Sequence, residues 1–263
     1  MPEGDTLHRT AYTLNRVLAQ QRLVRVRSSV PEIAQAELGG HVVEEVSALG
    51  KNLLIRFDDQ RVLHTHLKMR GSWHVYRPGE RWQRPEHQAR VVLEVGDALA
   101  VCFAAPTVRL LPPNAARNDA FLAGLGQDLI RDGFDEPKAI EDFRQFCALP
   151  VGEAIMKQQA VAGVGNIYKS ETLFLCRIDP FVQLLLLDDE DTARMIRTAR
   201  VLLRKNAQPG AVQRTTTGSG GGPYWVYKRS GRACRVCGTS IEMKRQGTLH
   251  RSTYYCRACQ VSP

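Results

Sequence analysis

Apolar residues recur every three to four positions near the start of the chain. The face that they mark in residues 6–18 consists of Leu7, Ala11, Leu14, Val17 and Leu18. This period predicts an amphipathic helix, and Asp5 or Thr6 can cap its first turn.

Residues 22–111 follow a different pattern, in which short aliphatic and β-branched runs are separated by turn signals such as Pro78-Gly79. The clearest predicted strands are residues 22–27, 51–57, 62–67 and 90–95. We therefore expect an antiparallel β-sandwich with one leading helix.

The pattern changes again after Pro112-Pro113. Helical periods occupy residues 136–149, 151–159, 167–176 and 188–205. Acids fill residues 188–191 and Arg204-Lys205 lie near the end of the last helix, so both ends complement its dipole. These patterns predict an α+β multidomain protein. Its expected parts are a β-sandwich domain (1–123), a linker (124–135), a helical domain (136–223) and a C-terminal module (224–263).

The excess positive charge is confined to the last fifth of the chain. The 263 residues carry a formal net charge of +9, and residues 205–263 hold ten basic residues against one acid. The rest of the chain is neutral overall. Aromatic residues such as Trp225 and Tyr254 interleave with these basic side chains. This combination favours a folded module that binds a polyanion, above all nucleic acid.

Four of the seven cysteines form two Cys-x-x-Cys pairs with 18 residues between them. Paired motifs of this kind are typical of a tetrahedral zinc site, and a four-sulfur shell leaves no open position for water. We expect one structural Zn²⁺ in a β-hairpin ribbon, held by Cys234, Cys237, Cys256 and Cys259. The remaining thiols lie in apolar stretches and are expected to be buried: Cys102, Cys147 and Cys176.

The sequence excludes two classes of protein. No run of about 18 apolar residues is present, which argues against a membrane-spanning protein. The N-terminus lacks the basic and then apolar order of a secretory signal. We therefore expect a cytoplasmic protein, a compartment that also disfavours disulfides.

The chain begins Met1-Pro2-Glu3. If Met1 is removed, Pro2 becomes an N-terminal secondary amine beside a carboxylate. An α-amine has a pKa of about 7.7–8.0, so a fraction is unprotonated at neutral pH and can attack an electrophilic carbon. If Met1 is retained, the Pro2 nitrogen is an amide and cannot attack.

Residues 161–168 read Val-Ala-Gly-Val-Gly-Asn-Ile-Tyr and predict a tight turn that leads into a helix. The two glycines let this turn approach another backbone closely. Asn166 is expected to cap the helix and leave N–H groups that suit a DNA phosphate. A helix–turn–helix without a ligand is the alternative.

Several motifs occur together and in a fixed order: Pro2-Glu3-Gly4, Gly50-Lys51, His66-Leu-Lys-Met-Arg-Gly71, residues 163–168 and the paired cysteines. The set resembles the formamidopyrimidine-DNA glycosylase and endonuclease VIII family of bacterial base-excision repair enzymes, and the resemblance covers the whole chain. It implies a β-sandwich, a helix–two-turn–helix and a zinc finger. It also implies a monomeric, nucleoid-associated enzyme that removes a damaged base from double-stranded DNA and cuts at the abasic site.

The resemblance implies catalytic roles for three residues. Pro2 corresponds to a nucleophile that attacks C1′, displaces the base and leaves an iminium. Glu3 corresponds to a general acid/base. Lys51 corresponds to a lysine that holds a phosphate, and its charge is expected to lower the pKa of the Pro2 amine.

The resemblance also implies DNA contacts at His66, Asn166 and Arg251. A flipped base leaves a void in the duplex. Met69, with Lys68 and Arg70 beside it, lies where the family inserts a wedge, and Arg109 is a further candidate for this role. The alternative for Met69 is a core position on a strand.

The residues 104–111, Ala-Ala-Pro-Thr-Val-Arg-Leu-Leu, lack the Asp-Pro-Arg-Arg-Phe-Gly-like loop of the purine-directed branch. This favours the endonuclease VIII branch and oxidised pyrimidines such as thymine glycol and dihydrouracil. We expect such an enzyme to cut the strand by β,δ-elimination. Two alternatives stay open. One is a glycosylase for formamidopyrimidine and 8-oxoguanine. The other is a non-catalytic DNA-binding relative, which the intact Pro2, Glu3 and Lys51 disfavour.

Overall fold

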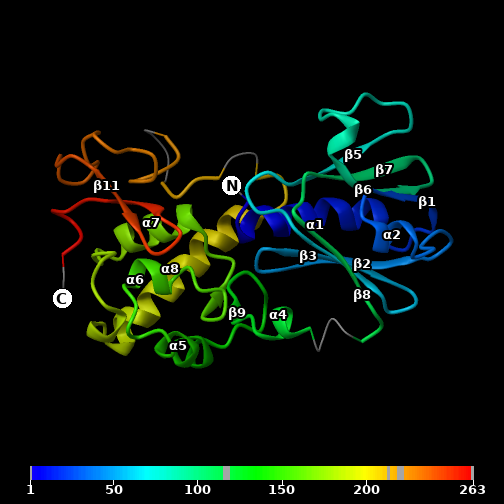
Figure 1. The fold of residues 1–263 in the computed structure, drawn as a ribbon. Helices are drawn as coiled ribbons and strands as arrows, with labels where there is room; N and C mark the ends of the chain where they lie inside the picture. Colours follow the sequence, from blue (N-terminus) through cyan, green and yellow to red (C-terminus); the bar gives the residue numbers. More distant parts are fainter. Residues whose placement is uncertain (1, 115–118, 212–213, 218–221, 262–263) are drawn as a thin grey trace. The chain divides into compact units, whose positions relative to one another are not determined.

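A computed structural model describes residues 2–114, 119–211, 214–217 and 222–261. The chain separates into two compact units, Met1–Gly124 and Leu125–Pro263. Figure 1 shows the elements of both units in sequence colours.

The first unit is a sandwich of two four-stranded antiparallel sheets, ordered β1-β6-β7-β5 and β2-β3-β4-β8. Figure 1 shows their strands as separate layers. The strands are β1 (Leu23–Ser28), β2 (Val43–Leu49), β3 (Asn52–Phe57), β4 (Val62–His66), β5 (Ser72–Tyr76), β6 (Ala89–Val95), β7 (Ala98–Phe103) and β8 (Thr107–Leu111). Aliphatic side chains from both sheets fill the core between them, among them Leu53, Ile55 and Leu93. The predicted sandwich is confirmed. Four of its strands lie within the range expected to form short strands but are not among the clearest predicted ones: β2, β5, β7 and β8.

The leading helix α1 (Gly4–Leu18) buries Leu7, Leu14 and Leu18 against this core. It packs on β2 and β3, and the Asn15 Oδ1 atom accepts a hydrogen bond of 2.7 Å from the Val46 N–H. The expected cap at Asp5 or Thr6 is wrong. The N-cap is Glu3, whose extended backbone places its carbonyl to accept from the N–H groups of the first turn. The short helices of this unit are α2 (Pro31–Ala34), η1 (Glu86–Gln88) and α4 (Ala120–Ala123).

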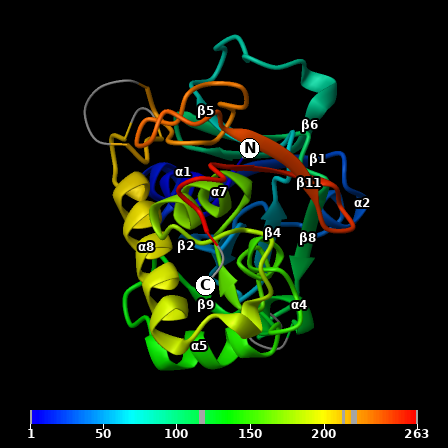
Figure 2. The ribbon, with the colours of Figure 1, turned by 90° about the vertical axis from the view of Figure 1, so that its left-hand side faces the viewer.

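The second unit is mainly helical, with α5 (Glu136–Arg144), α6 (Val151–Ala154), α7 (Asn166–Leu175), η2 (Leu184–Leu186) and α8 (Asp189–Ala207). Figure 2 shows the long α8 in yellow beside α7. Asp188 caps α8 by accepting from the Asp191 N–H over 2.7 Å. Three acids in the first turn and two basic residues in the last confirm the predicted charge pattern.

Two small sheets complete the second unit. β9 (Gln127–Asp128) pairs in parallel with β10 (Val161–Ala162), so part of the stretch expected as a linker is built into this unit. β11 (Glu242–Gln246) and β12 (Arg251–Tyr255) form the antiparallel hairpin expected near the C-terminus.

Two helices end earlier than their periodicity predicts. α5 ends at Arg144 because the carbonyls of Cys147 and Leu149 accept from the Leu185 and Leu184 N–H groups over 3.0 and 2.9 Å instead of continuing a helix. α6 ends at Ala154, and the carbonyl of Gln158 accepts from Gly126 N–H over 2.9 Å.

The isolated thiols divide into two groups. Cys102 and Cys176 are buried, and burial raises the pKa of each. The expectation for Cys147 is wrong: it is exposed, because it follows the end of α5 on a surface turn. Within the described residues, no helix combines the length and apolar character needed to cross a bilayer.

Candidate functional site

Pro2 and Glu3 lie at the entry to α1. Pro2 is half-buried, whereas Glu3 is fully buried. The Glu3 carbonyl accepts from the Thr6 and Leu7 N–H groups over 2.9 and 3.2 Å. These bonds fix the backbone of Glu3, from which its carboxylate side chain extends. Met1 lies outside the described residues, so its removal stays a prediction.

Lys51 lies in a two-residue turn between β2 and β3, closed by the register pair Leu49 and Asn52. The first turn residue, Gly50, has a φ of 57°, a left-handed value that favours glycine and matches the tight turns of hairpins. The motif Gly50-Lys51 thus has a geometric reason: the glycine makes the turn, and the turn presents the lysine.

His66 ends β4 and pairs in register with Asn52, the neighbour of Lys51. Burial, followed by the positive charges of Lys51 and Lys68, lowers the pKa of His66. The structure therefore brings together Lys51 and His66, two residues predicted to hold DNA, at one end of the strands of this sheet.

Met69 and Arg70 lie in the turn between β4 and β5, together with Lys68. The turn is tight: Gly71 N–H donates to the Leu67 carbonyl over 2.8 Å, and a Cβ at Gly71 would meet that oxygen at 2.7 Å. Met69 is 64% exposed, which rules out the core position that its apolar side chain also allowed. An apolar side chain at the tip of a rigid turn is suited to insertion between bases.

Arg109 pairs with Asp119 over 2.9 Å, and the Asp119 carboxylate also accepts from Leu122 N–H to cap α4. Arg109 faces His64 across the register of β4 and β8. Arg109, a candidate for filling the void left by a flipped base, is thus engaged by the Asp119 carboxylate.

In the second unit, Asn166 is the first residue of α7 and is buried. The expectation that it caps the helix is wrong. Gly165 is the N-cap and offers no side chain, while the Asn166 Nδ2 group donates to the Ser252 carbonyl over 2.7 Å. The Oδ1 atom of Asn166 is buried without a hydrogen-bond partner among the described residues.

Arg251 is the first residue of β12, next to Ser252, and is half-buried. The hairpin is held on α7 by buried polar contacts. The Lys169 Nζ group donates to Thr253 Oγ1 over 2.7 Å, and Thr253 Oγ1 donates to Gln246 Oε1 over 2.8 Å. A helix N-terminus, a buried ammonium group and Arg251 thus share one region, a combination suited to an anion such as phosphate.

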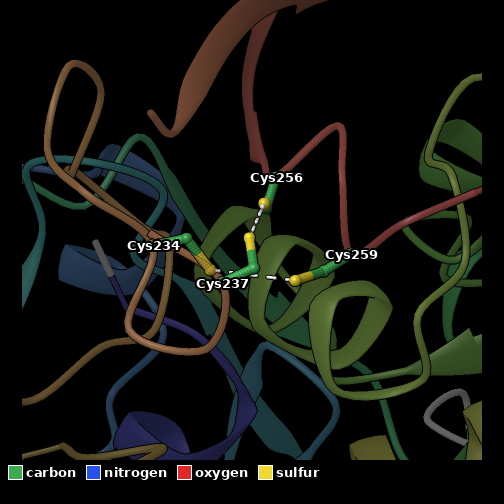
Figure 3. A group of neighbouring side chains, drawn as sticks. All are labelled: Cys234, Cys237, Cys256 and Cys259. Carbon is green, nitrogen blue, oxygen red and sulfur yellow. Dashed lines mark hydrogen bonds between the residues drawn. The ribbon is translucent and has the colours of Figure 1, made fainter. Parts of the chain in front are cut away.

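The four predicted metal ligands converge, as Figure 3 shows. All are free thiols, and their sulfur atoms lie within 4.8 Å of one another. Cys234 and Cys259 are 3.9 Å apart at sulfur, and Cys237 and Cys256 are 3.5 Å apart. Zn–S bonds of about 2.3 Å in a tetrahedron place sulfurs about 3.8 Å apart. The cluster therefore fits Zn²⁺ with a closed shell of four sulfurs.

Sequence reasoning missed several buried polar residues that support these sites. Asn52 and His64 lie next to the Lys51 turn, Lys169 on α7 contacts Thr253 within the hairpin, and Glu171 is buried on α7. The Glu171 carboxylate accepts from the N–H groups of Trp225, Val226 and Tyr227 over 2.8–2.9 Å. A polar residue inside an apolar run, as in Val62-Leu-His-Thr-His66, is the signal that was available.

Two protein-family descriptions match most of the chain. The formamidopyrimidine-DNA glycosylase N-terminal domain matches residues 1–107, and the formamidopyrimidine-DNA glycosylase H2TH domain matches residues 125–217.

Individual relatives match over at least 95% of their length. A "Probable endonuclease 8 2" of Streptomyces coelicolor is 38% identical over 266 residues, which cover 100% of this chain and 95% of the relative. A "DNA-(apurinic or apyrimidinic site) lyase Nei2" of Mycolicibacterium smegmatis is 36% identical over 264 residues and 100% of both chains. The solved structure of MutM in complex with DNA containing carbocyclic 8-oxo-G has a TM-score of 0.84, 21% identity and 99% coverage of this chain. At that identity the structural match shows the fold.

Proposed function

The chain belongs to the formamidopyrimidine-DNA glycosylase and endonuclease VIII family, and from this premise we propose that it is a bifunctional DNA glycosylase and abasic-site lyase of base-excision repair. The observation that carries the proposal is the 38% identity to an endonuclease 8 protein along the whole chain. The placement of Glu3 and Lys51 on ordered backbone supports it.

In the proposed reaction the Pro2 nitrogen forms a bond to C1′ of the damaged nucleotide while the bond from C1′ to the base breaks. The base leaves with a proton, and we assign the buried Glu3 as the general acid/base of this step. The sugar ring then opens: the C1′–O4′ bond breaks, O4′ takes a proton, and a Pro2 iminium is left at C1′. The iminium acidifies the C2′ proton, so loss of that proton breaks the 3′ C–O bond and releases the 3′ phosphate. A second elimination then breaks the 5′ C–O bond.

The remaining residues hold the DNA. Lys51 and His66 bind phosphate or sugar beside the reacting nucleotide, and Met69 fills the void left by the flipped base. Asn166, through the N-terminus of α7, and Arg251, on the β11–β12 hairpin, hold further phosphates. The hairpin depends on one structural Zn²⁺, which Cys234, Cys237, Cys256 and Cys259 would hold and which supplies folding energy rather than reaction chemistry.

We assign oxidised pyrimidines as the substrate class. Two features support the assignment. The chain lacks the purine-directed loop. Within the corresponding residues 104–111, Thr107–Leu111 form strand β8, and Asp119 pairs with Arg109.

Borohydride trapping tests the proposal. The protein is incubated with duplexes that carry thymine glycol, dihydrouracil, 8-oxoguanine or an abasic site, then reduced and mapped by peptide mass spectrometry. We expect a covalent adduct on the N-terminal peptide at Pro2, faster with the pyrimidine lesions than with 8-oxoguanine. Absence of an adduct on every duplex would overturn the enzyme assignment. Faster trapping on 8-oxoguanine would identify the purine-directed alternative.

A further inference from the structure

A buried chain of hydrogen bonds runs from β4 to the turn that presents Lys51. The His64 Nε2 atom lies 2.9 Å from Asn52 Oδ1, and the Asn52 Nδ2 group donates to the Leu49 carbonyl over 3.0 Å. His64 and Asn52 are 1% and 2% exposed, so water does not compete for these bonds. Leu49 and Asn52 are the two residues that close the turn. These hydrogen bonds therefore connect the closing pair of the turn to β4, an inner strand of the sheet.

The direction of each bond follows from the groups involved. A backbone carbonyl only accepts, so the Asn52 atom beside Leu49 is the amide nitrogen and the atom facing His64 is the oxygen. His64 therefore donates from Nε2. Its Nδ1 atom is buried and has no hydrogen-bond partner among the described residues, as expected for the unprotonated nitrogen of a neutral ring.

The surroundings of His64 keep the ring neutral. Burial first, and then the positive charges of Arg109 and His66, lower its pKa to about 4. Near neutral pH the ring therefore carries a single proton, on the nitrogen that faces Asn52. Each hydrogen bond in the series from His64 through Asn52 to Leu49 then has a defined donor and acceptor.

We propose that Asn52 and His64 are positioning residues for Lys51 in the glycosylase and lyase reaction. Lys51 is the second residue of a two-residue turn, so the strand pair that closes the turn sets the direction in which its side chain leaves the backbone. The Asn52 side chain bridges that pair and is itself held by His64. Loss of either side chain leaves buried polar groups unpaired and loosens the turn. The inference rests on the proposed function, which gives Lys51 its role.

The competing explanation is that these bonds only stabilise the sandwich. The neighbouring residue Thr65 supplies a matched control, because its Oγ1 atom accepts a buried hydrogen bond of 3.1 Å from Trp73 Nε1. Thr65→Val removes a buried hydrogen bond from the same strand without touching the Lys51 turn. His64→Phe and Asn52→Ala each interrupt the series of hydrogen bonds from His64 to Leu49. His64→Gln restores an N–H donor close to the position of Nε2.

The first measurement does not depend on catalysis. Trypsin cleaves after lysine, and the Lys51–Asn52 bond lies in the turn itself. We expect cleavage at this bond to be about tenfold faster in N52A and H64F than in the wild-type chain, as for a local opening that loses about 1.4 kcal/mol. H64Q and T65V are expected to cleave at the wild-type rate. Equal cleavage in N52A, H64F and T65V would overturn the inference.

The second measurement is the single-turnover rate of borohydride-trapped adduct formation on abasic DNA, with K51A as the reference. Misplacement of a catalytic group by about 1 Å costs up to about 100-fold in rate, so we expect N52A and H64F to be 10- to 100-fold slower at saturating DNA. H64Q and T65V should stay near the wild-type rate. A slow K51A together with a fast N52A would overturn the inference.

Failure of the proposed function is a separate outcome. If the wild-type chain forms no adduct, the enzyme assignment fails, and trypsin cleavage at Lys51 still decides whether Asn52 and His64 hold the turn. If H64F does not fold, N52A alone decides, because alanine adds no bulk to the core.

Discussion

The side-chain amide of Asn166 donates a hydrogen bond of 2.7 Å to the backbone carbonyl of Ser252, 86 positions further along the chain. This bond joins the first residue of α7 to the strand that carries Arg251. The two proposed phosphate contacts of the second unit are therefore parts of one structure, and each depends on the docking of the β11–β12 hairpin.

Asn166→Ala is expected to weaken binding to DNA containing a stable abasic-site analogue by about tenfold, the effect of about one lost hydrogen bond of 1.4 kcal/mol. The reason is that β12 loses the bond to α7 that lies beside Arg251, while the bond from Lys169 to Thr253 remains, so Arg251 is held less firmly. Fluorescence anisotropy measures the Kd. Thr192→Ala is the matched control, since it removes a hydrogen bond of 2.9 Å to the Asp188 carbonyl at the start of α8. Equal Kd values for the two variants would contradict the prediction.

Glu3→Gln is expected to slow base removal by about 100-fold or more while cutting at preformed abasic sites largely persists. Glutamine has the shape of glutamate, and the N-cap hydrogen bonds of α1 use the Glu3 carbonyl rather than its side chain, so the helix stays intact. Parallel assays on thymine glycol and abasic duplexes measure the two steps. Asp5→Asn, which alters another buried acid in the same turn, is the control. Equal loss of both steps in E3Q would argue against the role assigned to Glu3.

Removal of the metal is expected to abolish tight DNA binding while the first unit stays folded. Elemental analysis should find one zinc per chain in the wild-type protein and none in Cys237→Ser. Without the metal, the four thiols are joined by no disulfide, and the module that carries Arg251 loses its main source of folding energy. The exposed Cys147→Ser is the control. Full zinc content in C237S, or unchanged affinity after chelation, would refute the assignment.

Met69→Ala is expected to lower base removal from duplex DNA about tenfold, while removal from single-stranded DNA changes less because no stacked void needs filling. Thermal stability should stay within about 0.5 kcal/mol, since the side chain is mostly exposed. Val24→Ala, another exposed apolar position at 65%, is the control. A Met69→Ala enzyme that loses equal activity on both substrates would show that the side chain does not fill a void.

The stability of the first unit is expected to fall as the pH drops from 6.5 to about 4. The pKa of His64 is lowered from 6.5 to about 4 in the fold, so the unfolded chain binds more protons across this window and stability rises with pH there. The full shift corresponds to roughly 3 kcal/mol. Urea unfolding of the wild-type chain and H64Q at a series of pH values tests this. A wild-type dependence as flat as that of H64Q would contradict it.

The sequence by itself determined the features that arise between near neighbours. The period of residues 6–18 predicted α1, and the acids at 188–191 with Arg204-Lys205 predicted the charge pattern of α8. The spacing of the cysteines gave the metal cluster, because each Cys-x-x-Cys fixes two sulfurs locally. The ordered set of short motifs indicated the family, which the comparisons confirmed.

Only the tertiary structure decided how distant residues share hydrogen bonds. The sequence predicts that Asn166 caps a helix. In the structure its side-chain amide donates to the Ser252 carbonyl instead, and Gly165 is the N-cap residue. His64 and Lys169 lie in a predicted strand and a predicted helix, but their hydrogen-bond partners, Asn52 and Thr253, lie on other elements and cannot be identified from the neighbouring sequence. A buried polar group must be paired, and which group pairs with it is settled when the elements pack together.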